Sequence, residues 1–396
     1  MLAGAGKAEI DLEGVLPFDG FCSAHDPLCV RAVVMQNPDD TRACLLSVDA
    51  TSLRDDAPMR EAAVRAVGCP PADVWVTVTH TFSAPHVRTP GHLKNDDERE
   101  RNKRLAASFA SAVLKACAAA VESLVPARLQ TARGACSVNV NRDVETEAGW
   151  WLGVNPDGFS DRTVRAARLV STDSERRIVA TIYSADVQPS VTQGLQDEKG
   201  LFLVSSDLAG EASRLLEERH GGVAVFLVGT AGDQAPRAKG PEALRELGRA
   251  LAAEVDEALA GARPVRADAI LLSCATITVP AQRIAEFGSL VPTRAYEFVP
   301  DGTADLVIFV ARLGDLAVFG VQPELDSSFG ARLREAAPGR LEILTMVNGA
   351  AKYLPGSASY DRITYEAMNS RFARGADELL AKAVLELAER PRPAKA

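Results

Sequence analysis

The stretch from Val74 to His86, VWVTVTHTFSAPH, decides the fold of this chain. Its first five residues alternate valine with tryptophan and threonine, and this period of two predicts a β-strand. Polar residues follow at once, beginning with His80. Two of the five histidines of the whole chain, His80 and His86, lie in this stretch. Because α/β proteins assemble ligand sites where strands end, His80 is a candidate site residue, and a buried structural histidine is the alternative interpretation.

The composition is that of an ordinary globular protein. The chain has 396 residues, of which 47% are hydrophobic and 24% charged, and its net charge is −9 with a pI near 5.3. This acidic balance argues against a nucleic-acid partner, which basic patches would recognise. No apolar run reaches the roughly 18–20 residues that span a bilayer, and the N-terminus lacks a secretory apolar segment. We therefore expect a cytoplasmic protein that acts on a small molecule, with no membrane insertion; its oligomeric state is open.

The cysteines predict a reducing compartment. Seven of them, at positions 22, 29, 44, 69, 117, 136 and 274, are scattered along the chain without a CxxC pair. Several lie in apolar runs, among them Cys44 and Cys274. An odd, scattered set of this kind, in a chain without an export signal, predicts buried free thiols.

One order of elements recurs along the chain. It begins with two apolar strands around the turn Asn37 to Asp40 and continues with a helix, the strand that ends at His80, and a second helix. This hairpin–helix–strand–helix order is found in three units, at about 28–142, 166–280 and 304–390. No linker rich in Pro, Gly or Ser divides them. The sequence predicts an α/β fold in a single large domain over 1–396, with mixed β-sheets flanked by helices, although a generic α/β rhythm gives a similar pattern.

Alignment of the three units places polar residues at equivalent strand ends. The second strands of the hairpins end in LLSVDATSL, TIYSADVQPS and VFGVQPELD. The equivalent positions just past these strands are Thr51, Gln188 and Glu324. The later strand of each unit leads to His80, to the turn 229–233, and to the loop 348–353. Because strand ends at one edge of a sheet lie together, we expect these loops to be neighbours.

Six short motifs resemble those of the neutral/alkaline ceramidase family in their order along the chain. They are THTFSAPH, NVNRD, SSDLAG, GTAGDQAPR, QPE and KYLPGSASYDRITYE. The resemblance covers nearly the whole chain and implies the fold of that family's catalytic domain. It also implies a zinc ion that activates water to cleave an amide. Ceramidases of the family carry a C-terminal immunoglobulin-like domain as well, and we expect this chain to lack one.

The resemblance implies a zinc site with one irregular ligand. Three residues match the family's zinc ligands: His80, Glu324 and Tyr353. Gln188 stands where the family has its second zinc histidine, and a neutral amide is a poor zinc ligand. Asp186, two residues earlier and on the same face of a strand, is a better fourth ligand. His86 or His92 from the neighbouring loop is a further alternative.

Two other departures separate this chain from the family's ceramidases. Phe82 stands where the THTHS motif has its second histidine, and Ala235, in GDQAP, stands where those enzymes have a serine before the proline. A site altered at these positions is expected to take a substrate other than ceramide.

Four residues are candidate catalytic groups: Arg142, Tyr365, Asp233 and His86. The resemblance implies that Arg142 lies near the substrate carbonyl and that Tyr365 is an active-site tyrosine, so both would hold a developing oxyanion. Asp233 or Glu324 would move protons. An alternative role for Arg142 is a salt bridge that closes a loop. An alternative role for Asp233 is to cap a turn. Trp150-Trp151 is expected to anchor a loop to the core rather than to bind ligand.

Three functions follow from these residues. The first is a metal-dependent hydrolase, with zinc, of an amide or related acyl bond in a small molecule, and not a true ceramidase. The second is a metal-independent enzyme that performs a condensation, cyclisation or isomerisation with His80, Glu324, Tyr353 and Tyr365 as acid–base groups. The third is a ligand-binding or scaffolding protein with an inactive site. It ranks last because the candidate residues are still present together.

Overall fold

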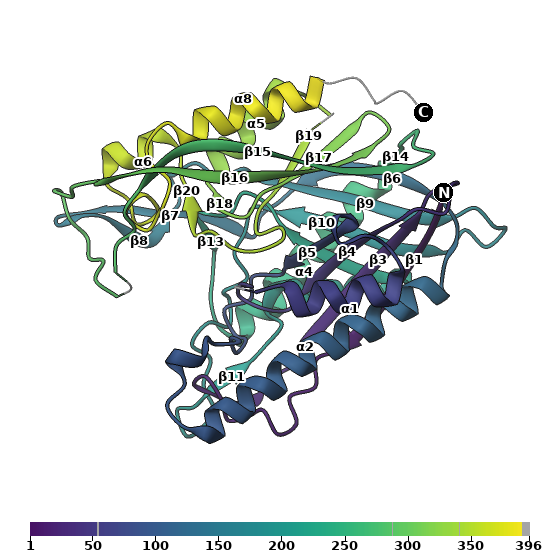
Figure 1. The fold of residues 1–396 in the computed structure, drawn as a ribbon, viewed down its shortest axis with the longest axis horizontal. Coiled ribbons are helices and arrows are strands. Elements are labelled where there is room, and N and C mark those ends of the chain that lie inside the picture. The colour runs from purple at the N-terminus through teal and green to yellow at the C-terminus, as the bar shows by residue number, and fades with distance from the viewer. Residues whose placement is uncertain (54, 287, 340, 390–396) are drawn as a thin grey trace.

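Two β-sheets pack face to face at the centre of the molecule, and helices cover the outer face of each (Figure 1). The computed structural model describes residues 1–53, 55–286, 288–339 and 341–389. The larger sheet is covered by α1 (Ala57–Val67), α2 (Asp96–Glu122), α3 (Asp207–His220) and α4 (Pro241–Ala260). The smaller sheet is covered by α5 (Ser327–Ala336) and α8 (Ala376–Glu389). The predicted α/β fold with mixed sheets flanked by helices is confirmed.

The larger sheet has nine strands, in the order β12-β10-β9-β6-β1-β3-β4-β5 with β14 paired to β6. Its strands are β1 (Leu2–Glu9), β3 (Cys29–Gln36), β4 (Arg42–Val48), β5 (Val74–Val78), β6 (Val125–Ala135), β9 (Thr163–Ser171), β10 (Ile178–Ala185), β12 (Val223–Val228) and β14 (Arg263–Pro264). The smaller sheet has the order β15 (Ile270–Gln282), β16 (Pro300–Leu313), β17 (Leu316–Gly320) and β19 (Leu341–Leu344).

Shorter elements surround the two sheets. A three-stranded sheet consists of β13 (Gln234–Pro236), β7 (Asn139–Thr146) and β8 (Gly149–Asn155). Two strand pairs are β11 (Phe202–Val204) with β2 (Phe21–Ala24), and β18 (Glu324–Leu325) with β20 (Tyr353–Leu354). The short helices are η1 (Pro71–Asp73), η2 (Pro90–His92), α6 (Ser357–Arg362) and α7 (Tyr365–Met368).

The three recurring units share one strand arrangement. Each hairpin is an antiparallel pair: β3 with β4, β9 with β10, and β16 with β17. The second strand of each pair then lies parallel to the strand that follows the next helix: β4 with β5, β10 with β12, and β17 with β19. Because paired parallel strands end at the same edge, each unit brings two loops together at that edge.

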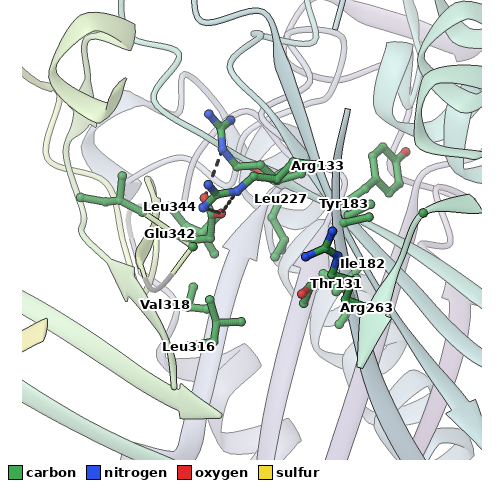
Figure 2. Close-up of a pocket in the computed structure, with 18 residues that line it drawn as sticks. Thr131, Arg133, Ile182, Tyr183, Leu227, Arg263, Leu316, Val318, Glu342 and Leu344 are labelled. Atoms are coloured by element: carbon green, nitrogen blue, oxygen red, sulfur yellow. Dashed lines mark hydrogen bonds and ion pairs between the residues drawn. The ribbon is translucent and has the colours of Figure 1, made fainter. Parts of the chain in front are cut away.

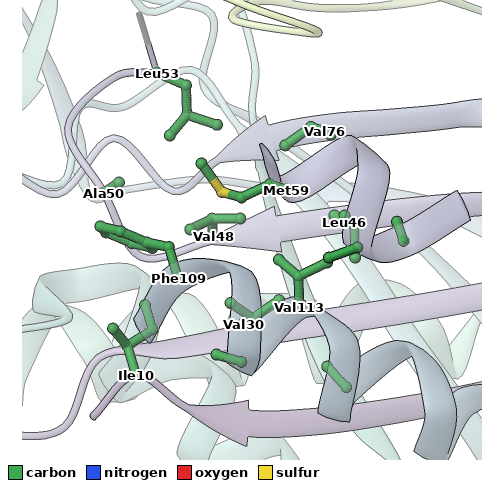
Figure 3. Close-up of a cluster of buried hydrophobic side chains, with 14 of the residues drawn as sticks. Ile10, Val30, Leu46, Val48, Ala50, Leu53, Met59, Val76, Phe109 and Val113 are labelled. Carbon is green, nitrogen blue, oxygen red and sulfur yellow. The ribbon is translucent and has the colours of Figure 1, made fainter. Parts of the chain in front are cut away.

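The larger sheet is buried on both faces. In β3, Val30 and Val34 belong to the cluster under α1 and α2, whereas Val33 and Met35 face the smaller sheet. Figure 3 shows Phe109 of α2 over the side chains of the strands. Burial on both faces explains why these strands are almost continuously apolar in sequence.

Helix α2 corrects one expectation, because it meets the length and composition of a membrane span. It is 27 residues long, and Asn95 caps its first turn by accepting a hydrogen bond from the backbone N–H of Glu98 at 2.8 Å. Its apolar residues, among them Leu105, Phe109 and Val113, are buried in the cluster between α1 and the larger sheet. This packing accounts for its apolar composition.

Trp150 and Trp151 lie in a strand and not in the expected loop. They belong to β8, where they pair with Glu145 and Val144 of β7. Aromatic residues fit the pleated, half-buried surface of a strand, and both indoles are half-buried. Trp150 and Trp151 therefore belong to the three-stranded sheet that β8 forms with β7 and β13.

The cysteines are free thiols, as predicted, but not all are buried. Cys22 is half-buried and Cys274 is exposed, and the other five are buried. Cys274 lies in β15, the edge strand of the smaller sheet, on the same face as Ile270 and Leu272 but beyond the part of that face that the larger sheet covers. The apolar sequence around it indicated a strand correctly but not which face was covered.

Substitution of a buried and of an exposed phenylalanine tests whether the core beneath the helices contributes most to the free energy of unfolding. Phe109→Ala removes a ring that is 2% exposed, and Phe159→Ala removes one that is 52% exposed. We expect the first change to lower the free energy of unfolding by about 3–5 kcal/mol, because it leaves a cavity. The second should change it by less than about 0.5 kcal/mol. Urea denaturation measures both, and equal losses would contradict this account of the core.

Candidate functional site

Polar strand ends from all three units meet in one buried cluster. His80 follows β5, Gln188 follows β10, and Glu324 begins β18 just after β17. The Glu324 carboxylate Oε2 lies 3.3 Å from His80 Nε2 and accepts a hydrogen bond from Gln188 Nε2 at 2.9 Å. The side chains of His80 and Glu324 are only 4% and 8% exposed. The structure thus brings together three of the four predicted metal ligands.

His80 is fixed in orientation by its neighbours. Its Nδ1 lies 2.5 Å from the backbone oxygen of Thr51. A carbonyl only accepts, so Nδ1 carries the proton and Nε2 faces Glu324. The backbone of His80 is in the left-handed region, with φ of 63°, which is uncommon for a residue other than glycine. Phe82 lies edge-on to the imidazole, with ring centroids 4.8 Å apart. These contacts preorganise Nε2 within the cluster.

Arg142, on β7, closes the other side of the cluster. Its Nη1 donates to Gln188 Oε1 at 2.7 Å and its Nη2 to the Tyr353 hydroxyl at 3.2 Å. Nε and Nη2 both donate to Glu366 Oε1, at 2.9 and 2.6 Å. Burial would lower the pKa of Arg142, but Tyr353, Glu366 and Glu324 hold it well above its usual value. A permanently charged guanidinium therefore lies among the predicted ligands.

Two tyrosines enclose the Arg142 guanidinium. Its carbon lies 5.5 Å from the ring centre of Tyr353 and 6.0 Å from that of Tyr365, within the range of cation–π attraction. Tyr353 is buried, and burial raises the pKa of its hydroxyl well above the usual range. Tyr365 is half-buried, with its ring 5.6 Å from that of Trp151. The side of Tyr365 and Trp151 is therefore the more open side of the cluster.

Behind Arg142 lies a pair of carboxyl groups, Asp143 and Glu366. Burial, followed by repulsion from Glu366 and Asp233, raises the pKa of Asp143 to about 10. Interaction with Glu366 thus favours the protonated form of Asp143. The remaining charge of Glu366 is matched by Arg142, with 2.6 Å between Nη2 and Oε1.

Asp233 connects elements around the cluster. Its Oδ1 accepts hydrogen bonds from the backbone of Ser327 at 2.8 Å and from Gln234 at 3.0 Å. Its Oδ2 accepts one from Asn141 at 3.0 Å. Burial raises the pKa of Asp233 to about 6. These bonds tie the start of α5 to β7 and β13.

Three residues considered at the sequence level lie outside the cluster. His86 is exposed, with Nδ1 2.8 Å from the carboxylate of Asp19, and His92, also exposed, bonds to Thr89. Asp186 is buried but accepts hydrogen bonds from Thr230 and, at 3.0 Å, from Arg334. Strand β10 ends at Ala185, so the period of two that placed Asp186 on the same face as Gln188 does not continue to these residues.

Comparison with known proteins agrees with this architecture. No protein-family model and no curated protein matches the sequence. Among solved structures, a ceramidase complexed with C2 aligns with a TM-score of 0.72 at 18% identity, over 100% of this chain and 77% of that chain. The neutral ceramidase from Pseudomonas aeruginosa aligns with a TM-score of 0.71 at 18% identity, over 100% and 76%. The chain has the fold of a neutral ceramidase. The resemblance inferred from the six motifs therefore extends to the whole fold.

Two groups of the cluster are not predicted by the sequence patterns. Glu366 pairs with Arg142, and in the sequence it is the last residue of the motif that contains Tyr365. An acidic residue directly after a candidate tyrosine is the signal that points to it. Thr51 was aligned with Gln188 and Glu324, but it acts through its backbone oxygen, which no side-chain pattern reveals.

The donor set does not fit the four-ligand zinc site that the resemblance implies. Zinc sites in proteins use Cys, His, Asp and Glu, with at least three protein ligands. The described residues contain no group of three or more such side chains placed to hold a metal. His80 and Glu324 are suitable donors, but Gln188 Oε1 and the Tyr353 hydroxyl both face the Arg142 cation.

A separate cavity of about 530 Å³ lies between the two sheets (Figure 2). Arg133, Arg165 and Glu342 line it, and Glu342 pairs with Arg133 at 2.5 Å and with Arg165 at 3.1 Å. The described residues that line this cavity include none of the predicted site residues. It is therefore distinct from the candidate site.

The buried carboxyl pair predicts a particular dependence of stability on pH. The pKa of Asp143 is about 10 in the folded chain and near 3.9 when unfolded, so its contribution to stability falls as pH rises between these values. Asp143→Asn keeps a hydrogen-bond donor toward Glu366 and cannot ionise. We expect its melting temperature, relative to the unsubstituted protein, to increase steadily from pH 5 to pH 9.

The matched control is Asp157→Asn, at an exposed carboxyl group. Its melting temperature should follow that of the unsubstituted protein at every pH. Thermal unfolding followed by circular dichroism makes the comparison. A constant difference for Asp143→Asn across the pH range would show that Asp143 is not protonated in the fold.

Proposed function

We propose that this chain is an enzyme that cleaves an amide or related acyl bond in a small molecule. The proposal is supported by the ceramidase-like fold and, above all, by one observation at the candidate site. An imidazole, a carboxylate, a guanidinium and a phenol hydroxyl from distant parts of the chain meet in a single buried cluster. Burial strengthens each of their electrostatic interactions with a reacting group.

Arg142 and Tyr353 are the proposed binding groups for the carbonyl oxygen. Arg142 has five N–H donors, and its hydrogen bonds to Gln188, Tyr353 and Glu366 use four of them among the described residues. One hydrogen on Nη1 remains for a substrate. The Tyr353 oxygen accepts from Arg142, so its own proton is also available. Two such donors stabilise the negative charge that develops on a carbonyl oxygen.

His80 and Glu324 are the proposed acid–base pair. The Thr51 carbonyl holds Nδ1–H, so Nε2 is the atom that exchanges a proton with an attacking water or a leaving amine. Glu324 stabilises the charged imidazole that forms. Burial would raise the pKa of Glu324, but His80, Arg142 and Gln188 together keep it below its usual value. Glu324 thus stays ionised for this role.

The second candidate is a metal-independent condensation, cyclisation or isomerisation catalysed by the same residues. The family resemblance implies zinc, but Gln188 forms hydrogen bonds with both Arg142 and Glu324, so two of the expected ligands are already engaged. That network favours an enzyme that needs only its own side chains, including one that catalyses a condensation, cyclisation or isomerisation. A chelator tests whether either reaction needs zinc, because only a zinc-dependent enzyme would lose activity.

We also propose that the substrate is not ceramide and that the location is cytoplasmic. Gln188, Phe82 and Ala235 differ from the ceramidase motifs, which supports a changed substrate. The seven cysteines are all free, and Cys44 and Cys117 lie with their sulfur atoms 3.8 Å apart without a disulfide, which supports a reducing compartment.

Substitutions of His80 and Glu324 test the proposed reaction. Hydrolysis is measured on a panel of N-acyl compounds that includes ceramide. We expect His80→Ala and Glu324→Ala to lower kcat/KM by about 100-fold or more, because each removes a general acid–base group. His86→Ala, a matched exposed histidine, should stay within about twofold.

Circular dichroism of each variant establishes that it is folded. Ceramide should not be turned over by the unsubstituted protein. Full activity in folded His80→Ala would refute the acid–base role, and unchanged ligand affinity in both cluster variants with no turnover by any protein would favour the binding-only alternative.

A further inference from the structure

The orientation of one amide group determines what the cluster can bind. Gln188 lies between two charges of opposite sign, Glu324 and Arg142. Its Nε2 donates to Glu324 and its Oε1 accepts from Arg142, at 2.9 and 2.7 Å. The reverse orientation would place an oxygen against a carboxylate and an NH₂ group against a guanidinium. The two charged neighbours therefore fix Oε1, the only side-chain atom of Gln188 suited to ligate a metal, toward the cation.

The position of Arg142 opposes a divalent cation in the cluster. A zinc ion bound to Gln188 Oε1 at about 2.1 Å would lie within about 5 Å of Arg142 Nη1. The Tyr353 hydroxyl, a second expected ligand, also receives Arg142, at 3.2 Å. Arg142 cannot lose its charge and is held from behind by Glu366. Like charges at this separation in a buried site repel strongly.

We propose that this site has no resident zinc ion, and that Gln188 excludes zinc by holding the Arg142 guanidinium among the would-be ligands. The cluster retains half of a zinc site, His80 and Glu324, with 3.3 Å between Nε2 and Oε2. The permanent positive charge at its centre belongs to Arg142. This inference concerns metal binding alone, so its test does not depend on whether the protein cleaves acyl bonds.

If the inference is correct, one substitution should allow the cluster to bind zinc. Gln188→His removes the amide oxygen that Arg142 holds and adds a second imidazole beside Glu324. With His80 and Glu324 this makes two histidines and one glutamate, a ligand set that catalytic zinc sites use. Gln188 is 2% exposed, so the introduced imidazole has little freedom to turn away from the cluster. Gln193→His adds a histidine at an exposed position of the same loop and is the matched control.

The experiment measures zinc per chain in untagged, full-length protein after dialysis against zinc and then against zinc-free buffer. We expect less than about 0.1 zinc per chain for the unsubstituted protein and for Gln193→His, and about one for Gln188→His. Combining Gln188→His with His80→Ala should return the content to the unsubstituted level. About one zinc in the unsubstituted protein, lost in His80→Ala, would overturn the proposal.

Folded Gln188→His with no more zinc than the control would overturn it as well. If Gln188→His does not fold, Arg142→Met provides the second test, because removal of the guanidinium should raise the affinity for zinc measured by competition with a chelating dye. Unchanged affinity in folded Arg142→Met would refute the role assigned to Arg142. A zinc-containing protein that cleaves amides would reject this inference and leave the proposed function intact.

Discussion

The buried charge of Arg142 is the constraint on which the candidate site depends. A guanidinium taken out of water must be paired and hydrogen-bonded, or the fold loses several kcal/mol. Its partners come from separate parts of the chain: Gln188 after β10, Tyr353 in β20 and Glu366 in α7. Each partner is positioned in turn by its own element. The site is therefore assembled around a cation that the protein itself supplies.

The recurring units explain why these residues meet. In every unit a hairpin strand and a later strand run parallel and end at one edge. Each unit delivers one residue of the central chain of contacts, namely His80, Gln188 and Glu324. Gln188 and Glu324 stand at equivalent positions of their units, whereas His80 follows the later strand of the first unit. The chemical asymmetry of the site lies in the residues and not in the architecture.

Much of the fold was predictable because it rests on local patterns. The period of two from Val74 to Val78 and the three hairpin turns gave the strands, and the aligned units gave the neighbourhood of His80, Gln188 and Glu324. Less predictable were features that depend on tertiary contacts. Trp150-Trp151 form a strand because β7 is there to pair with it. Nothing local shows that His86 meets Asp19 or that Glu366 meets Arg142, because such pairs are separated by long stretches of chain.

The long separation between Arg142 and Glu366 has a consequence for biosynthesis. The two residues are 224 positions apart in the chain. A ribosome that adds about 5–20 residues per second needs roughly 10–45 seconds to reach Glu366 after Arg142 has been made. During that interval the guanidinium has no carboxylate partner from the last unit and must remain hydrated. The nascent chain therefore cannot complete the buried cluster around Arg142 until the last unit has been made.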